Sequence, residues 1–256
     1  MTRPIVLLPP SKGKAAGGGD PVYGDHLDVG HPLDEPRREV LKAAQAAADD
    51  VDDRGIARLT GVKVERVAEQ RPVLAQLATA PTLPAHRRYT GVVHEHAGLM
   101  DVDPTTAGLD VRIVSALLGL ATLDDPVPDY RLEVAASLPP LGGLGRFWRE
   151  HLAEHLAELT EVPMWDLLPG EHAVVWPEDV RGDRQVRRVR FVRADGRAAP
   201  AARVKIAKGR LVAALLADPD LTPSGVAEHV DLGPTWTLAA SATEVVATDD
   251  GDGRRS

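Results

Sequence analysis

An amphipathic segment from Leu144 to Leu159 limits the possible folds of this chain more than any other feature. Its large apolar side chains recur at helical spacing and form one broad arc, with charged side chains on the opposite side. Most of the stability of such a helix comes from packing the apolar arc against another element. We therefore expect this helix to pack on a sheet.

Short apolar runs elsewhere predict the strands of that sheet. Ile5–Leu8 ends at Pro9-Pro10, where a central strand cannot continue. The remaining predicted strands are 111–118, 131–135, 186–193, 202–206 and 236–247. The third and fourth of these flank Asp195-Gly196, a turn signal that predicts a β-hairpin.

Helical patterns are interspersed irregularly among the strands. Asp34 is expected to cap a helix that reaches the acidic cluster 49–53. Further helices are predicted at 56–59, 62–77, 211–217 and 222–230. The irregular order predicts an α+β fold: a compact single domain, residues 1–248, with a mixed sheet and packed helices. Residues 249–256 are expected to form a disordered tail.

The absence of cysteine excludes several functions in a chain of 256 residues. Thiol peroxidases, disulfide scaffolds, iron–sulfur proteins and cysteine-based zinc sites all need thiols. No apolar run is long enough to span a bilayer, and the N-terminus lacks a signal-peptide pattern. We expect a cytoplasmic protein with no membrane partner, and no cofactor.

Charge is unevenly distributed along the chain. The overall net charge is −8, yet residues 181–210 contain eleven Lys and Arg against two Asp, a local net charge of +9. The other residues therefore carry −17. A basic segment with so few internal partners indicates contact with nucleic acid or another polyanion, or else a solvated charged hairpin.

The loop after the first predicted strand contains Lys12 and Lys14 in a glycine-rich context. Glycines let backbone amides approach an anion, and lysines neutralise its charge, so this loop is a candidate anion site. It does not fit the phosphate-binding loop motif, because Leu8 and Ala15 stand where that motif needs Gly and Ser or Thr. The alternative is a mobile surface loop.

Two further patterns have a structural and a functional interpretation. His151, Glu154 and His155 spell H-x-x-E-H, which predicts a zinc hydrolase or, alternatively, ordinary histidines at the edge of the core. Residues 56–62, with Gly61 between two helical segments, resemble a helix-hairpin-helix module that presents amides to a DNA phosphate. A purely structural helical hairpin is the other interpretation.

Five short motifs in order resemble the YaaA family of peroxide stress proteins. They are Pro9-Pro10-Ser11-Lys12, Tyr89-Thr90-Gly91, Asp129-Tyr130-Arg131-Leu132-Glu133, Phe147-Trp148 and Ala207-Lys208-Gly209-Arg210. The resemblance implies a compact α+β fold with a basic cleft, a helix-hairpin-helix-like element, DNA binding and a role in resistance to hydrogen peroxide. The chain departs from the family pattern at 115–124 and 166–170.

The resemblance also suggests roles for matched residues. Lys12 would be the cation of the loop, Tyr89 and Thr90 hydroxyl donors, and Arg131 an anion ligand oriented by Glu133. The expected anion- or nucleic-acid-binding set is Lys12, Lys14, Tyr89, Thr90, Arg131, Glu133, Lys205, Lys208 and Arg210. The leading expectation is non-specific binding of duplex DNA. The alternatives are an enzyme acting on a phosphorylated or carboxylated small molecule in the same cleft, and the zinc hydrolase.

Overall fold

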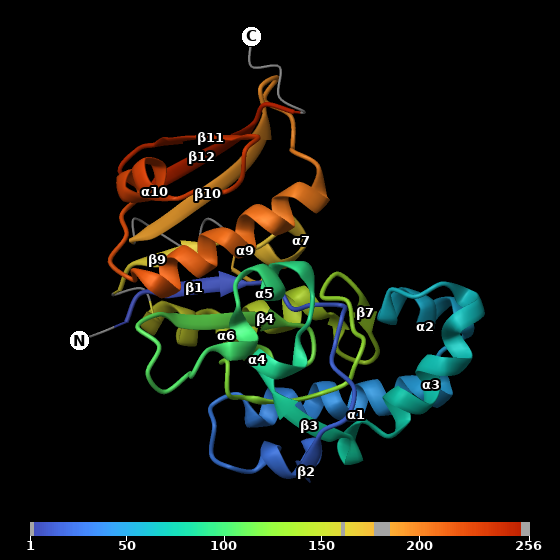
Figure 1. The fold of residues 1–256 in the computed structure, drawn as a ribbon. Helices are drawn as coiled ribbons and strands as arrows, with labels where there is room; N and C mark the ends of the chain where they lie inside the picture. The colour runs from blue at the N-terminus through green and yellow to red at the C-terminus, as the bar shows by residue number, and fades with distance from the viewer. Residues whose placement is uncertain (1–2, 160–161, 177–184, 252–256) are drawn as a thin grey trace.

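A seven-stranded sheet forms the centre of the fold within residues 3–159, 162–176 and 185–251, which the computed structural model describes (Figure 1). Its strands, in spatial order, are β11 (Trp236–Ala240), β12 (Glu244–Asp249), β10 (Val186–Arg193), β9 (Met164–Asp166), β1 (Ile5–Leu8), β4 (Asp110–Ser115) and β5 (Gly119–Ala121). The strands from β12 to β4 run parallel, and the two edge strands are antiparallel. The sheet is therefore mixed, as expected.

β1 is an inner strand of the parallel part. All four of its residues are buried, with β9 on one side and β4 on the other. This explains its continuous apolar sequence, because a parallel strand is usually covered on both faces. After β1 the chain forms β4 on one side of it, and after β5 it returns to form β9 on the other side. The carboxyl end of β1 is therefore a topological switch point, where open parallel sheets usually bind ligands.

Helices cover this sheet and extend beyond it. They are α1 (Asp34–Asp50), α2 (Asp53–Thr60), α3 (Val67–Ala75), α4 (Ala85–Arg88), α5 (Val92–His96), α6 (Leu144–Glu158), α7 (Gly170–Ala173), α9 (Ala201–Ala217) and α10 (Pro223–His229). In Figure 1, α9 and α5 lie together over one side of the sheet, and α2 and α3 lie far from β11 and β12. Two small sheets complete the fold: β2 (Gly19–Val22) with β3 (Pro81–Pro84) and β6 (Pro126–Pro128), and β7 (Ser137–Leu138) with β8 (Gly142–Gly143).

The amphipathic helix packs on the core as predicted. Trp148, Leu152 and Leu156 of α6 are buried. The Trp148 indole Nε1 donates a hydrogen bond to the carbonyl oxygen of Ala116 at 2.8 Å, which satisfies its one polar atom. The expected α+β fold is confirmed.

Two predicted strands are not strands. Residues 131–135 form an extended segment and a turn, in which the Glu133 amide donates to the Leu59 carbonyl outside any sheet. Residues 202–206 lie in α9, which also contains the short helix predicted at 211–217. Both segments alternate apolar and polar residues as a strand does, but so short an alternation also occurs in an extended loop or by chance within a helix. The predicted hairpin is therefore wrong, although Asp195-Gly196 does form a turn after β10.

Several boundaries also differ from those predicted. Asp34 is the first residue of α1 rather than its cap, and its carboxylate accepts from the amides of Val29 and His31. The expected strand 236–247 is two strands, β11 and β12, separated by a turn at Ser241. β12 includes Asp249, which is buried, so this residue is not part of a tail; residues 252–256 lie outside the described part of the chain.

The two helices predicted around Gly61 are present as α2 and α3. The second begins at Val67 rather than Val62, because a 3-10 turn, Val64–Arg66, separates them. The helix-hairpin-helix interpretation stays a prediction. No helix within the described residues has the length and apolar character that a membrane crossing needs.

Candidate anion-binding site at the strand ends

The loop that follows β1 is held by the segment around Tyr89. Lys14 forms an isolated antiparallel β-bridge with Tyr89, and the Thr90 amide donates to the Gly13 carbonyl at 3.1 Å. Gly91 packs directly on Ser11, because a Cβ at Gly91 would lie 2.0 Å from the Ser11 hydroxyl oxygen. Two of the matched motifs therefore meet in space, and the glycine is needed for their contact.

Lys14 is a half-buried cation packed on two aromatic rings. Its Nζ lies 4.3 Å from the centre of the Tyr130 ring and 5.5 Å from that of Tyr89, and donates to the Ser11 carbonyl at 3.0 Å. Burial lowers the pKa of Lys14 to about 8, and the positive charges of Arg131 and Arg88 act the same way, against the attraction of Asp129 and Glu133. A fraction of this lysine is therefore neutral near pH 8.

A chain of buried hydroxyl groups lies beneath Lys14. The Tyr89 and Tyr130 hydroxyl oxygens are 2.9 Å apart, and the Tyr130 oxygen is 2.6 Å from that of Ser115 at the end of β4. Burial raises the pKa of both tyrosines, so both stay neutral. Tyr89 thus contributes a ring to the site, while its hydroxyl bonds within the core.

Lys12 extends from the loop to Glu133. Its Nζ is 2.6 Å from a Glu133 carboxylate oxygen, and the Lys12 side chain is 66% exposed against 24% for Glu133. Glu133 packs directly against Gly61, which ends α2 in a left-handed conformation (φ 65°). A Cβ at Gly61 would lie 1.9 Å from a Glu133 carboxylate oxygen. Glu133 therefore pairs with Lys12, and not with Arg131 as the matched motif suggested.

Lys208 approaches the same region from α9. It is buried, and its Nζ donates to the carbonyl oxygen of Leu167, just after β9, at 2.5 Å. Burial lowers the pKa of Lys208 to about 8, although Asp166 opposes the shift. The accepting atom belongs to the backbone, so the contact does not depend on the side chain of the divergent segment 166–170.

His172 shows that these charges lie close together. Burial lowers its pKa; Glu171 and Glu133 oppose this shift, while the positive charges of Lys208 and Lys12 add to it. Its Nδ1 is buried and accepts or donates no hydrogen bond among the described residues, and the Glu171 carboxylate lies 3.7 Å from it. We call the group Lys12, Lys14, Arg131, Glu133, His172 and Lys208 the strand-end site, because it lies beyond the carboxyl ends of β1 and β9.

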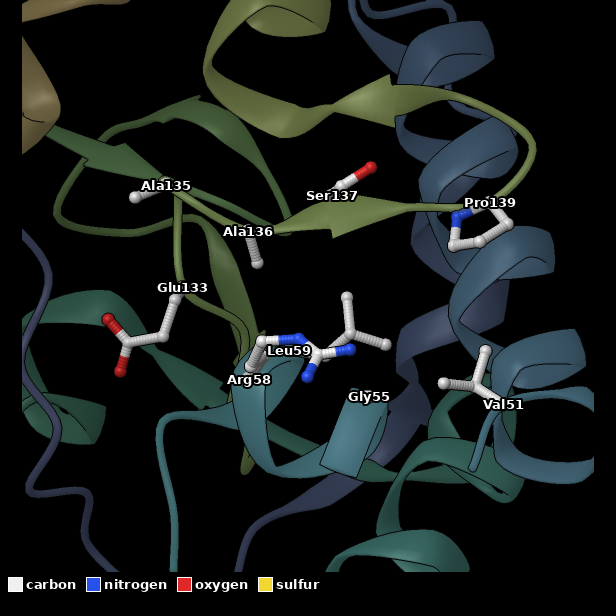
Figure 2. Close-up of a pocket in the computed structure, with 9 residues that line it drawn as sticks. All are labelled: Val51, Gly55, Arg58, Leu59, Glu133, Ala135, Ala136, Ser137 and Pro139. Carbon is white, nitrogen blue, oxygen red and sulfur yellow. The ribbon is translucent and has the colours of Figure 1, made fainter. Parts of the chain in front are cut away.

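A cavity of about 640 Å³ lies beside Glu133, between α2 and residues 133–139 (Figure 2). Figure 2 shows the Arg58 side chain extending into it, with the Glu133 carboxylate at one side. Arg54 and Arg58 of α2 and Lys63 just after it are exposed, and within the described part of the chain none of them forms an ion pair.

The structure does not bring every predicted residue to this place. Thr90 is exposed beside Gly13, close to the loop. Lys205 is exposed on α9, and the Arg210 guanidinium packs against Gly233 instead. His172, Ser115 and the aromatic role of Tyr130 were not predicted, because no local pattern in the sequence marks them.

Several described cations of the basic segment 181–210 have partners inside or outside the segment. Arg203 pairs with Asp249 at 3.0 Å, Arg197 with Asp195 at 3.5 Å and Arg190 with Glu244 at 3.9 Å. Arg187 lies over the Trp165 ring and donates to the Leu221 carbonyl. Arg181 and Arg184 lie outside the described residues.

The H-x-x-E-H residues lie on α6 away from this site. The His151 Nδ1 is hydrogen-bonded with the Phe147 carbonyl oxygen at 2.9 Å, and its ring packs on that of Phe147. The His155 ring lies 6.4 Å from that of His31. Across the described residues, no group of three or more His, Asp or Glu side chains is arranged to hold a metal ion.

Comparison with known proteins identifies the family. The sequence model of the family described as peroxide stress protein YaaA matches residues 5–228 of this chain. The chain belongs to this family. A UPF0246 protein of Streptomyces coelicolor is 32% identical over 234 residues, which cover 89% of this chain and 88% of the relative. A UPF0246 protein of Corynebacterium glutamicum is 30% identical over 173 residues, covering 66% of this chain and 67% of the relative. This YaaA-family member is a peroxide stress-associated protein.

Proposed function

We propose that this YaaA-family protein acts in the cytoplasm in resistance to peroxide, by binding the phosphates of duplex DNA without strong base specificity. The main support for the proposal is electrostatic: the charges of Lys12 and Lys208 act on His172, and that of Arg131 acts on Lys14. Arg54 and Arg58 of the neighbouring α2 form no ion pair within the described part of the chain. Phosphate contacts of this kind give affinity without base recognition.

The face of α2 supplies the outer part of the surface. Arg54 and Arg58 are four residues apart on one helix and both are exposed. At its N-terminus, Asp53 pairs with Arg71 at 2.7 Å, while the Asp52 carboxylate caps the helix by accepting from the Gly55 amide at 2.7 Å and keeps its charge. A phosphate backbone that crosses this face would reach Lys12 past Glu133.

Duplex binding is expected to depend strongly on salt. If about five phosphates are contacted, log affinity should fall against log salt with a slope of about −4 to −5. Fluorescence anisotropy of a labelled duplex between ~50 and ~200 mM salt measures this slope. Replacing Arg54 and Arg58 together by alanine should reduce the slope by about 2 and weaken binding equally for unrelated sequences.

Arg66→Ala is the matched control, since Arg66 is exposed in the turn between α2 and α3 but is paired with Glu69 at 2.7 Å. It should leave the slope nearly unchanged. Absence of duplex binding at the lowest salt concentration would remove the DNA proposal.

An enzyme that acts on a small phosphorylated or carboxylated molecule is the second candidate. It is favoured by the recessed position of Lys14 and Lys208, which a small anion reaches more easily than a duplex does. A thermal-shift screen of metabolites tests it, because a ligand at 100 times its dissociation constant adds about 2.7 kcal/mol to the free energy of unfolding.

Anion affinity is expected to fall as the pH rises through about 8. Lys14 and Lys208, both with a pKa of about 8, lose their charge there, so the site loses attraction for an anion. Sulfate binding followed by calorimetry from pH 7 to pH 10 measures this, because sulfate keeps its charge over the range. For each lysine that must be protonated to bind sulfate, the sulfate affinity should fall by up to about tenfold per pH unit above 8.

The free energy of unfolding should change in the opposite sense. Between about pH 8 and 10.5 both lysines bind protons more strongly in the unfolded chain, so stability rises with pH over this window. The double variant Lys14→Met/Lys208→Met should flatten both profiles. A wild-type sulfate affinity that stays constant to pH 10 would contradict a role for these two lysines.

A further inference from the structure

Lys14 packs on aromatic rings and forms no ion pair with a described residue. The Glu133 carboxylate pairs with Lys12 at 2.6 Å, and the Lys14 Nζ contacts the Ser11 carbonyl oxygen and the faces of the Tyr130 and Tyr89 rings. Burial against the two rings and the nearby charges of Arg131 and Arg88 favour the neutral amine, and they outweigh the attraction of Asp129 and Glu133. Lysines become nucleophiles in such surroundings, desolvated and next to other positive charges.

The neighbours of Lys14 also define what kind of molecule the amine would meet. Lys12 is mostly exposed and Arg131 is half-exposed, and the charge of Arg131 acts on Lys14. These two cations can hold a phosphate while its attached carbon chain extends to Lys14. Arg131 is suited to the two-oxygen contact that a phosphate offers.

We propose that Lys14 forms a Schiff base with an aldehyde carried next to a phosphate group. The proposal deepens the proposed function, because it rests on phosphate binding by the strand-end site. Two sources share this chemistry: a small aldehyde phosphate, and a sugar in DNA that has lost its base and opened to the aldehyde.

The reaction needs no redox partner. The lone pair of the neutral Lys14 nitrogen forms a bond to the carbonyl carbon, and the carbonyl π pair moves to the oxygen. A proton passes from nitrogen to that oxygen and gives the carbinolamine. The second nitrogen proton and the hydroxyl group then leave as water, so that a C=N double bond replaces the C–O bond with no net gain or loss of electrons.

Lys208 is a built-in comparison for this reactivity. Its pKa is also lowered to about 8, yet its side chain is buried and its Nζ is held by the Leu167 carbonyl at 2.5 Å. Lys14 is only half-buried and belongs to the loop beside Lys12. Reactivity governed by proton loss alone would label both lysines, whereas reactivity governed by the site geometry selects Lys14.

Reductive trapping tests the proposal. The full chain is incubated with glyceraldehyde 3-phosphate, or with glyceraldehyde as the partner lacking phosphate, in the presence of sodium cyanoborohydride, which reduces an imine to a stable amine. Peptide mass spectrometry then locates the adduct. We expect Lys14 to be modified about tenfold faster, or more, by the phosphorylated aldehyde. A parallel arm uses a duplex with one abasic sugar and looks for a covalent complex through Lys14.

Lys14→Arg keeps the positive charge but removes the primary amine, and it should abolish the adduct. Modification in one arm alone identifies the source of the aldehyde. Equal labelling of Lys14 by the two small aldehydes together with no complex with the abasic duplex, or labelling spread evenly over all lysines, would overturn the proposal.

The two proposals fail separately. Binding of intact duplex without any Lys14 adduct would leave DNA binding standing and remove the Schiff base. A phosphate-dependent Lys14 adduct without duplex binding would do the reverse.

Discussion

Arg88→Met should lower the free energy of unfolding by about 3–5 kcal/mol, the usual cost of breaking a buried charged network. Arg88 is 0% exposed. Its guanidinium donates to the carbonyl oxygens of Val127 at 2.9 Å, Gly17 at 3.0 Å and Pro81 at 3.1 Å, and also to that of Ala15. Methionine fills much of the volume but satisfies none of these acceptors, and each one left buried and unpaired adds to the cost.

The same substitution should disturb the strand-end site, because Arg88 ties the end of the Lys14 loop to β3 and β6. The Ala15 amide also donates to the Arg88 carbonyl at 2.8 Å, so the loop is anchored to this residue in both directions. Urea unfolding measures the stability, and sulfate affinity measures the site.

Arg87→Met is the matched control for Arg88→Met. Arg87 is exposed in the same helix, and its replacement should change stability by less than about 0.5 kcal/mol. A loss in Arg88→Met no larger than that in Arg87→Met would show that the buried guanidinium is not what holds the loop.

The parts of the fold that sequence predicted well are those with one dominant pattern. The uninterrupted apolar run of β1 can form only an inner strand or part of a buried helix, and Pro9-Pro10 ends it too early for a helix. The strand is indeed buried on both faces. α6 carries its apolar arc through four turns, which no strand can imitate. Long or strongly punctuated patterns leave few alternatives.

Short patterns were decided by tertiary contacts instead. Leu132 and Val134 alternate with polar residues as in a strand, and both are indeed buried, but the backbone between them bonds to Leu59 rather than to a neighbouring strand. Val204 and Ile206 alternate in the same way inside α9, where alanine and leucine favour the helix. A five-residue pattern cannot distinguish these outcomes.

The strand-end site was predicted only in part for a similar reason. Lys12 and Lys14 follow a strand and Lys208 lies in a matched motif, so their side-chain chemistry was visible. The pairing of Glu133 with Lys12, and the position of His172, depend on how α2, α7 and α9 pack around the loop. No local signal marks His172, because its neighbours come from distant segments.

Glu133→Gln is expected to strengthen anion binding, by about tenfold for sulfate at low salt. Glu133 is an acid inside a basic site: it pairs with Lys12, and its charge acts on Lys14 and His172. An incoming anion must approach this carboxylate and compete with it for Lys12, and removing one negative charge at such distances is worth roughly 1–2 kcal/mol in a partly solvated site. Glutamine keeps the shape that packs on Gly61.

Stability should hardly change in Glu133→Gln, because the pair with the mostly exposed Lys12 contributes at most about 1 kcal/mol. Glu65→Gln makes the same change in net charge at an exposed position and should leave sulfate affinity unchanged. Isothermal calorimetry of both variants at constant ionic strength separates the local from the overall charge effect. Weaker binding in Glu133→Gln alone would mean that the carboxylate positions Lys12 for the ligand instead of competing with it.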